Sequence, residues 1–172
     1  MGYTLYDASI ALTRDALASL SAVLKKAEGS ANAAKLPEAR LAEDMLPLSF
    51  QVHVLTDLSQ KLYHRLAAQE PLKWENSLKD YSEMQGRIAQ TEELLSKATK
   101  DEVNKHDGDT VTVGLGPGKN APMSTTAYVN GYILPNVFFH LTAAYAILRK
   151  EGVPLGKMDY LTPFLSKYVP DL

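Results

Sequence analysis

The sequence contains no cysteine, and only 4 of its 172 residues are histidine. Without cysteine, the chain forms no disulfide, no iron–sulfur cluster and no thiolate zinc site. Any metal would need histidine, aspartate or glutamate as its ligands. The absence of cysteine also fits a reducing compartment, so we expect a cytoplasmic protein.

The sequence also lacks an excess of charge of one sign. It has 18 Lys and Arg against 20 Asp and Glu, a formal net charge of -2, without charged blocks. Proteins that bind nucleic acid or anionic membranes usually present a basic surface, so we expect neither partner. No unbroken apolar run approaches the roughly 20 residues that a bilayer requires. Residues 1–10 do not combine a basic leader with an apolar core. These features predict a soluble protein.

Four long segments have the spacing of amphipathic helices. A chain of this length with 45% hydrophobic residues can close one core, so we expect a single domain over residues 1–172. Apolar residues recur at intervals of three and four in each segment. The predicted helices span residues 5–28, 47–70, 77–98 and 124–150. Gly29 is expected to cap the first helix, and Gly152 to end the last one in a Schellman motif.

The connections between these segments contain shorter elements. Residues 30–44 are predicted to hold a short helical turn after Pro37. Residues 107–122 alternate briefly and are then broken by glycine and proline, which indicates a short hairpin or an ordered loop. We therefore predict an all-α fold, an up-down four-helix bundle with a long crossover that contains this hairpin or loop before the last helix. The apolar tail from Gly156 is expected to pack back across the bundle.

One histidine lies within the most apolar helix. At about 100° per residue, His140 falls on the same side of its helix as Ala144 and Ile147, so it should face inward. Asn136 lies one turn earlier, and Tyr132 is at the edge of the same sector. Pro135 is expected to kink the helix between them. These polar groups either satisfy each other and the backbone within the core or line a polar pocket.

The second helix divides its polar residues between two faces. His53, Asp57, Gln60 and His64 lie opposite the leucine stripe; their spacing resembles a metal motif, and their orientation predicts a solvated face. Gln51 and Ser59 fall within or beside the stripe and should point inward. Gln51 is the better candidate for a pocket, where its amide would bind a ligand or His140.

Other motifs indicate no particular chemistry. Residues 114–120, GLGPGKN, lack the spacing of a P-loop and are interpreted as a turn. His106 lies in a charged segment without the alternating oxygen ligands of an EF-hand. The sequence shows no GxSxG, HExxH or Ser-His-Asp order.

Two stretches carry a resemblance to a known family. They are YVNGYILPNVFFHLTAAYAILRKEGVPLGKMDYL (residues 128–161) and MLPLSFQVHVLTD (residues 45–57). They resemble a domain-of-unknown-function family of fungal and bacterial proteins in the DinB/YfiT-like helical-bundle superfamily. The resemblance covers nearly the whole chain. It implies a four-helix bundle, often dimeric, with a central pocket open at one end.

The resemblance also bears on metal binding. Many members of the superfamily bind a divalent metal through one histidine on the second helix and an HxxxH pair on the fourth. His140 matches one histidine of the pair, but Ala144 occupies the other position. The second-helix ligand would be Gln51 or His53, and the predicted facing favours the glutamine. An amide, one imidazole and an alanine are poor ligands for zinc or nickel, so we expect no metal and no other cofactor.

Four functions are compatible with these observations. The first is a metal-independent enzyme that isomerises, eliminates or cyclises a fairly apolar metabolite, with His140 as the proton shuttle and Gln51, Ser59, Tyr132 and Asn136 as substrate-binding residues. The second is a non-catalytic module that binds a small molecule in the same pocket. The third is a DinB-like metal-dependent hydrolase or transferase in which His53, Asp57 and His140 converge. The fourth is a bundle that serves mainly to form a homodimer.

Overall fold

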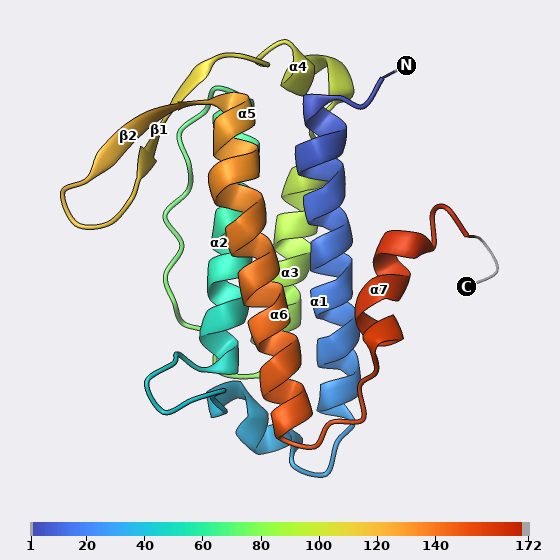
Figure 1. Ribbon diagram of the computed structural model, residues 1–172. Helices are drawn as coiled ribbons and strands as arrows, with labels where there is room; N and C mark the ends of the chain where they lie inside the picture. Colours follow the sequence, from blue (N-terminus) through green and yellow to red (C-terminus); the bar gives the residue numbers. More distant parts are fainter. Residues whose placement is uncertain (1, 170–172) are drawn as a thin grey trace.

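The computed structural model describes residues 2–169 and is predominantly helical, with one small sheet (Figure 1). The long helices are α1 (Leu12–Glu28), α2 (Leu48–Leu66), α3 (Tyr81–Ser96) and α6 (Leu134–Lys150). The shorter elements, in chain order, are η1 (Asp7–Ala11), η2 (Ala33–Glu38), α4 (Lys100–Asn104), β1 (Thr110–Gly114), β2 (Asn120–Ser124), α5 (Thr125–Tyr128), η3 (Val129–Ile133) and α7 (Lys157–Leu165). The expected all-α, DinB-like bundle is confirmed.

The four long helices do not simply alternate in direction. The hydrogen bond between Ser21 and Gln85 and the ion pair between Arg14 and Glu92 join α1 and α3 in antiparallel order. The extended residues 67–80 run back along the bundle from the end of α2 to the start of α3 (Figure 1). The helices α2 and α3 are therefore parallel neighbours, and residues 67–80 form a second long connection.

The connection between α4 and α5 is a hairpin. This confirms one of the two forms predicted for residues 107–122, a short hairpin or an ordered loop. Strands β1 and β2 pair antiparallel, with Thr110 opposite Ser124 and Gly114 opposite Asn120. Residues 115–119 close the turn, in which Gly116 and Gly118 have φ values of 123° and 70° that favour glycine. The hairpin projects from the end of the bundle where α5 begins (Figure 1).

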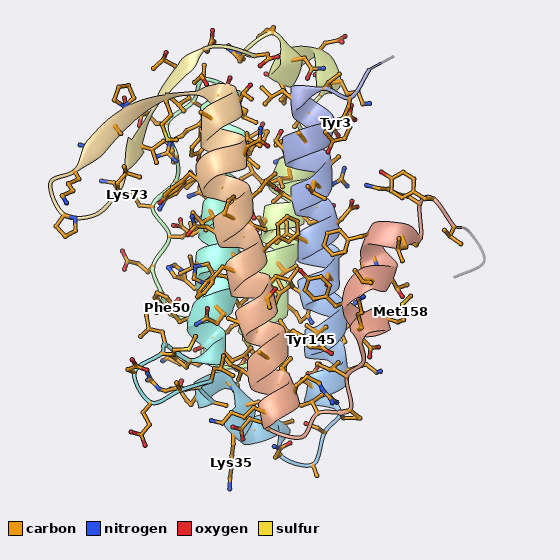
Figure 2. The ribbon with its side chains drawn as sticks, in the orientation of Figure 1. Tyr3, Lys35, Phe50, Lys73, Tyr145 and Met158 are labelled. Atoms are coloured by element: carbon orange, nitrogen blue, oxygen red, sulfur yellow. The ribbon has the colours of Figure 1, made fainter. Side chains whose placement is uncertain are left out.

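The apolar stripes of the long helices meet in one hydrophobic core. Burial of these stripes supplies most of the stability of such helices. The tail packs against the outside of this bundle as expected, with α7 beside α1 (Figure 1). Tyr145 of α6, labelled in Figure 2, lies edge-on to Tyr160 of α7, with 6.1 Å between the ring centroids. Residues 170–172 of the tail lie outside the described residues.

Helix ends follow local sequence signals in several places. The Schellman motif at Gly152 is confirmed: its φ is 86°, and the amides of Gly152 and Val153 donate to the carbonyls of Arg149 and Leu148. Gly29 is the C-cap of α1, as expected. Helix α3 begins at Tyr81 rather than near residue 77, because the carboxylate of Asp80 accepts the amide of Glu83 at 2.9 Å and caps the helix there.

One local prediction needs correction, and the chain before Pro135 forms a turn that was not predicted. The short helical turn in the first connection spans Ala33–Glu38 and contains Pro37, rather than following it. Pro135 lies in the first turn of α6, and the chain forms the π-helical turn η3 directly before it. Because proline has no amide hydrogen and its ring crowds the preceding turn, this wider turn accommodates it within a continuous helical segment.

Residues Thr125–Lys150 are long and apolar enough, by length and composition, to cross a membrane. Only unbroken apolar runs were considered in the sequence, and this segment is interrupted by polar residues, so it was not identified there. Its buried residues Val137, Leu141 and Leu148 belong to the core, and α6 packs against α1 and α2. Core helices of soluble proteins pass the same test of length and composition.

Candidate functional site

The candidate site is built around a hydrogen bond between α2 and α6. Nδ1 of His140 lies 2.8 Å from Oε1 of Gln51. Gln51 is in the first turn of α2 and is buried, whereas His140 is half-buried in the middle of α6. The predicted inward orientation of Gln51 is therefore confirmed, and its amide binds His140, one of the two partners expected for it.

The surrounding contacts determine which nitrogen of His140 carries the proton. The amide nitrogen of Gln51 donates to the backbone carbonyl of Leu46 at 2.8 Å, so the other end of the amide is an acceptor oxygen. Nδ1 of His140 must then be the donor. In the neutral ring this leaves Nε2 with a free lone pair.

His140 is neutral at physiological pH. Burial lowers the pKa of its imidazole from 6.5 to about 4, because the charged form loses hydration in this environment. Within the described residues, Nε2 has no hydrogen-bond partner, and it is not among the fully buried polar atoms. The lone pair of Nε2 is thus an acceptor that is not fully enclosed by the described residues.

An apolar groove adjoins this histidine. It has a volume of about 420 Å³ and is lined on the α6 side by Phe138, Phe139, Thr142, Ala143 and Ala146. The ring of Phe139 stands edge-on to His140, with 5.2 Å between the centroids. On the helix, His140 lies between the groove residues Phe139 and Ala143 and the buried face of α6. His140 therefore stands at the inner border of the groove rather than on its floor.

The opposite wall of the groove is the loop before α2. Leu41 and Met45 contribute its apolar surface. Arg40 donates to the carbonyl of Met45 at 2.7 Å, and Gln51 holds the adjacent carbonyl of Leu46. One glutamine thus fixes both the loop wall and the orientation of His140. The apolar residues of this loop, in an otherwise polar connection, were the sequence signal for the groove that our sequence reasoning missed.

The other predicted pocket residues do not join this pair. The hydroxyl of Ser59, buried two turns along α2 from Gln51, donates to the carbonyl of Leu55 at 2.7 Å. Asn136 donates to the carbonyl of Tyr132 at 2.6 Å within its own helical segment. Tyr132 stacks on Tyr128 and directs its hydroxyl to the carbonyl of Gly114 in the hairpin. The structure therefore brings together only Gln51 and His140 from the predicted set.

The polar face of α2 corrects another prediction. His53, Gln60 and His64 are buried rather than solvated. Gln60 exchanges two hydrogen bonds with the backbone of Leu72, at 2.9 and 3.0 Å, and so attaches the extended connection to this face. The helical period of α2 alone could not show that another part of the chain covers its polar side.

His53 is enclosed on this second face. Its Nδ1 is buried without a hydrogen-bond partner in the described residues. Burial is the main cause of its lowered pKa, and the nearby Asp57 carboxylate partly opposes the shift. His53 therefore belongs to the face of α2 that the extended connection covers, not to the His140 site.

Comparisons with known proteins agree with this architecture. The family model described as "Domain of unknown function (DUF1993)" matches residues 5–161. The chain belongs to this family. A crystal structure of a DinB family member protein from Shewanella denitrificans is similar to this DUF1993 protein, with 30% sequence identity, 91% of each chain covered and a TM-score of 0.80. No curated protein matches the sequence.

The superfamily resemblance raises the question of a metal, and the donor set does not fit one. Around His140, the amide oxygen of Gln51 already accepts a hydrogen bond, and Ala144 supplies no ligand. In the described part of the chain, no group of three or more His, Asp or Glu side chains is placed to hold a metal ion. We therefore derive no metal-dependent step for this site.

Proposed function

We propose that this DUF1993 protein binds a small, largely apolar molecule in the groove beside His140. The observation that carries the proposal is the hydrogen bond between Gln51 and His140, which fixes the ring and leaves Nε2 as its acceptor beside Phe139 of an apolar groove. A single oriented polar group beside an apolar surface is the usual composition of a small-molecule site.

The groove indicates the chemistry of this ligand. Its volume of about 420 Å³ is within the usual range for small-molecule sites. Among the described residues that line the groove, only Thr142 is polar, so most of the ligand must be apolar. Nε2 of His140 accepts but does not donate when the ring is neutral. The matching ligand is therefore a flat or branched hydrocarbon body that carries one hydroxyl group or another hydrogen-bond donor.

The site favours binding over catalysis. A general base works best when its pKa is near the working pH, and the pKa of His140 is lowered to about 4. Among the described residues, no carboxylate lines the groove, and no base is placed to activate the hydroxyl of Thr142. We therefore rank the binding module above the metal-independent isomerase or lyase that the sequence suggested first. Removal of one proton by Nε2 is the catalytic alternative.

Variants test the proposed binding directly. We expect 2-naphthol, which has an apolar body and one hydroxyl, to bind with a Kd of roughly 10–100 μM. Naphthalene lacks the hydroxyl and should bind about tenfold more weakly, because it leaves Nε2 without a partner. His140→Phe should weaken 2-naphthol binding by about the same factor and leave naphthalene binding unchanged.

Controls separate the groove from general surface adsorption. Phe139→Ala removes an aromatic wall of the groove and should weaken binding of both compounds several-fold. Tyr3→Ala removes an equally large exposed aromatic outside the groove and should change neither affinity. If all variants bind 2-naphthol equally, the groove is not its site. If a slow conversion of a bound ligand is found and His140→Gln reduces it about 100-fold, catalysis replaces binding as the function.

The remaining expectations become part of this proposal. We propose that the protein acts in the cytoplasm and binds neither nucleic acid nor membrane. A homodimer would have to leave the groove open for the ligand. Sedimentation of the protein with and without 2-naphthol tests this point, since a dimer that closes over the groove should dissociate on binding.

A further inference from the structure

A second cleft lies at the opposite end of α2 from Gln51. It has a volume of about 390 Å³ and is formed by the end of α2, the residues that follow it, and β1 with the loop before it. Gln51 and Arg65 are 14 residues apart on this helix, which separates the two sites by about 20 Å. Its polar lining includes Arg65, Glu70, His106, Asp109, Thr110 and Thr112.

The cleft contains a paired histidine and aspartate. Nδ1 of His106 lies 2.7 Å from Oδ2 of Asp109. An ionised carboxylate only accepts hydrogen bonds, so Nδ1 carries a proton. Nε2 has no hydrogen-bond partner within the described residues and faces away from this bond as the second nitrogen of the ring, which accepts a hydrogen bond in the Nδ1–H tautomer. The side chain of His106 is 19% exposed, whereas that of Asp109 is 59% exposed. The dyad therefore has its histidine inside the cleft and its carboxylate at the surface.

One buried threonine holds the loop that carries the dyad. The hydroxyl of Thr125 donates to the carbonyl of His106 and accepts the amide of Gly108, both at 3.0 Å. The amide of Thr125 donates to the carbonyl of Asp109 at 2.8 Å. These three bonds fix the loop at the start of α5. A site that is held in place before a ligand arrives loses less entropy on binding.

Arg65 supplies a positive charge on the other side of the cleft. One terminal nitrogen of its guanidinium donates to the hydroxyl of Tyr128 at 2.9 Å, and the group lies 5.3 Å from the centre of that ring. These contacts orient the guanidinium. Within the described residues, no other hydrogen bond engages it, so one edge remains available. Guanidinium edges of this kind bind carboxylates through two parallel hydrogen bonds.

We propose that this cleft binds a small hydroxy acid, with its carboxylate on Arg65 and its hydroxyl on Nε2 of His106. The hydroxyls of Thr110 and Thr112 supply further polar contacts along β1. The two carboxylates of Glu70 and Asp109 outweigh the single positive charge of Arg65, so the cleft has no excess positive charge. A single carboxylate therefore fits better than a phosphate dianion, which these two carboxylates would repel. This proposal is independent of the function proposed for the His140 groove.

Nuclear magnetic resonance of the histidine rings in the full chain tests the proposal, with lactate as the probe. The four ring signals are assigned with single His→Gln variants, and sodium chloride keeps the ionic strength constant. We expect a saturable shift of the His106 signal with a Kd of roughly 1–10 mM and no shift of the His140 signal. Propionate, which lacks the hydroxyl, and lactamide, which lacks the carboxylate, should each bind at least about threefold more weakly.

Variants on both sides of the cleft complete the test. Arg65→Gln should weaken lactate binding about tenfold or more, and Arg65→Lys should restore part of it. Because Arg65 also contacts Tyr128, the exposed substitution Asp109→Ala provides a second variant that leaves the core intact. It removes the hydrogen-bond partner of Nδ1 and should weaken binding several-fold. Lack of a saturable His106 shift up to about 50 mM lactate, equal binding by all variants, or tighter binding of inorganic phosphate than of lactate would each overturn the proposal.

Discussion

The bond between Gln51 and His140 can be tested by removing each partner in turn. Gln51→Leu keeps the approximate volume of the side chain but leaves two groups without partners, the carbonyl of Leu46 and Nδ1–H of His140. Burying an unpaired polar group costs about 1–3 kcal/mol. Since both bonds are only partly buried, we expect the lower end of this range for each group. The free energy of unfolding should fall by about 2 kcal/mol.

A double-mutant cycle isolates the contribution of the bond itself. The variants are Gln51→Leu, His140→Phe and the combination of the two, each unfolded in urea and followed by circular dichroism. The double variant should be about 1 kcal/mol more stable than the sum of the single effects predicts, because neither change then leaves the other side chain unpaired. Ser59→Ala is the matched control on the same helix. Its hydroxyl bonds only within α2, and its coupling to His140 should be close to zero.

One result of the double-mutant cycle would contradict the hydrogen bond between Gln51 and His140. A coupling energy between Gln51 and His140 below about 0.3 kcal/mol would be within the usual error of additivity for independent sites. The two side chains would then not form the bond on which the tautomer of His140 depends. The argument for a free Nε2 acceptor would be refuted with it.

Two further predictions follow from the same structure. The pKa of His140 is about 4 in the folded chain and 6.5 as a free side chain, so on acidification the unfolded chain binds a proton at this residue before the folded chain does. The contribution of His140 to the free energy of unfolding should therefore be fully present above pH 6.5 and be lost as the pH falls towards 4. We expect a decrease of about 1–2 kcal/mol, after allowance for the partial exposure of the ring. His140→Gln should remove this part of the pH dependence in urea unfolding, and an unchanged profile would contradict the assignment. Ala68 has a φ of 52° in the Schellman motif that ends α2, a conformation that favours glycine, so Ala68→Gly should raise the free energy of unfolding by about 0.5–1 kcal/mol. Ala67→Gly, at a negative φ of -95°, is the control and should not stabilise; equal effects of the two would show that the backbone at Ala68 is not strained.

Helical periodicity located the four long helices and part of the site. It placed Gln51 inward. The Schellman motif at Gly152 could be predicted because the local sequence alone determines such a helix end. Because Gln51 was predicted to point inward, its amide was expected to bind either a ligand or His140, and it binds His140. These features depend on residues within one or two turns of each other.

The features that sequence reasoning missed depend on contacts between distant segments. His53, Gln60 and His64 were assigned to solvent because nothing in α2 reveals that residues 67–80 cover it. Tyr132 and Asn136 were placed beside His140 by helical angle, but their polar groups bind the hairpin and their own helix. The groove requires both α6 and the loop of Leu41 and Met45, and no periodic pattern connects these two.

The most direct test of the proposed function is the nitrogen resonance of His140 during a titration with 2-naphthol. In the free protein, Nδ1 should have the chemical shift of a protonated nitrogen and Nε2 that of a bare one, because Gln51 accepts from Nδ1. Binding should move the Nε2 resonance saturably towards the protonated value and leave the His106 ring unchanged. If Nε2 already carries the proton in the free protein, or if 2-naphthol saturates without affecting it, His140 is not the acceptor and the proposed site is wrong.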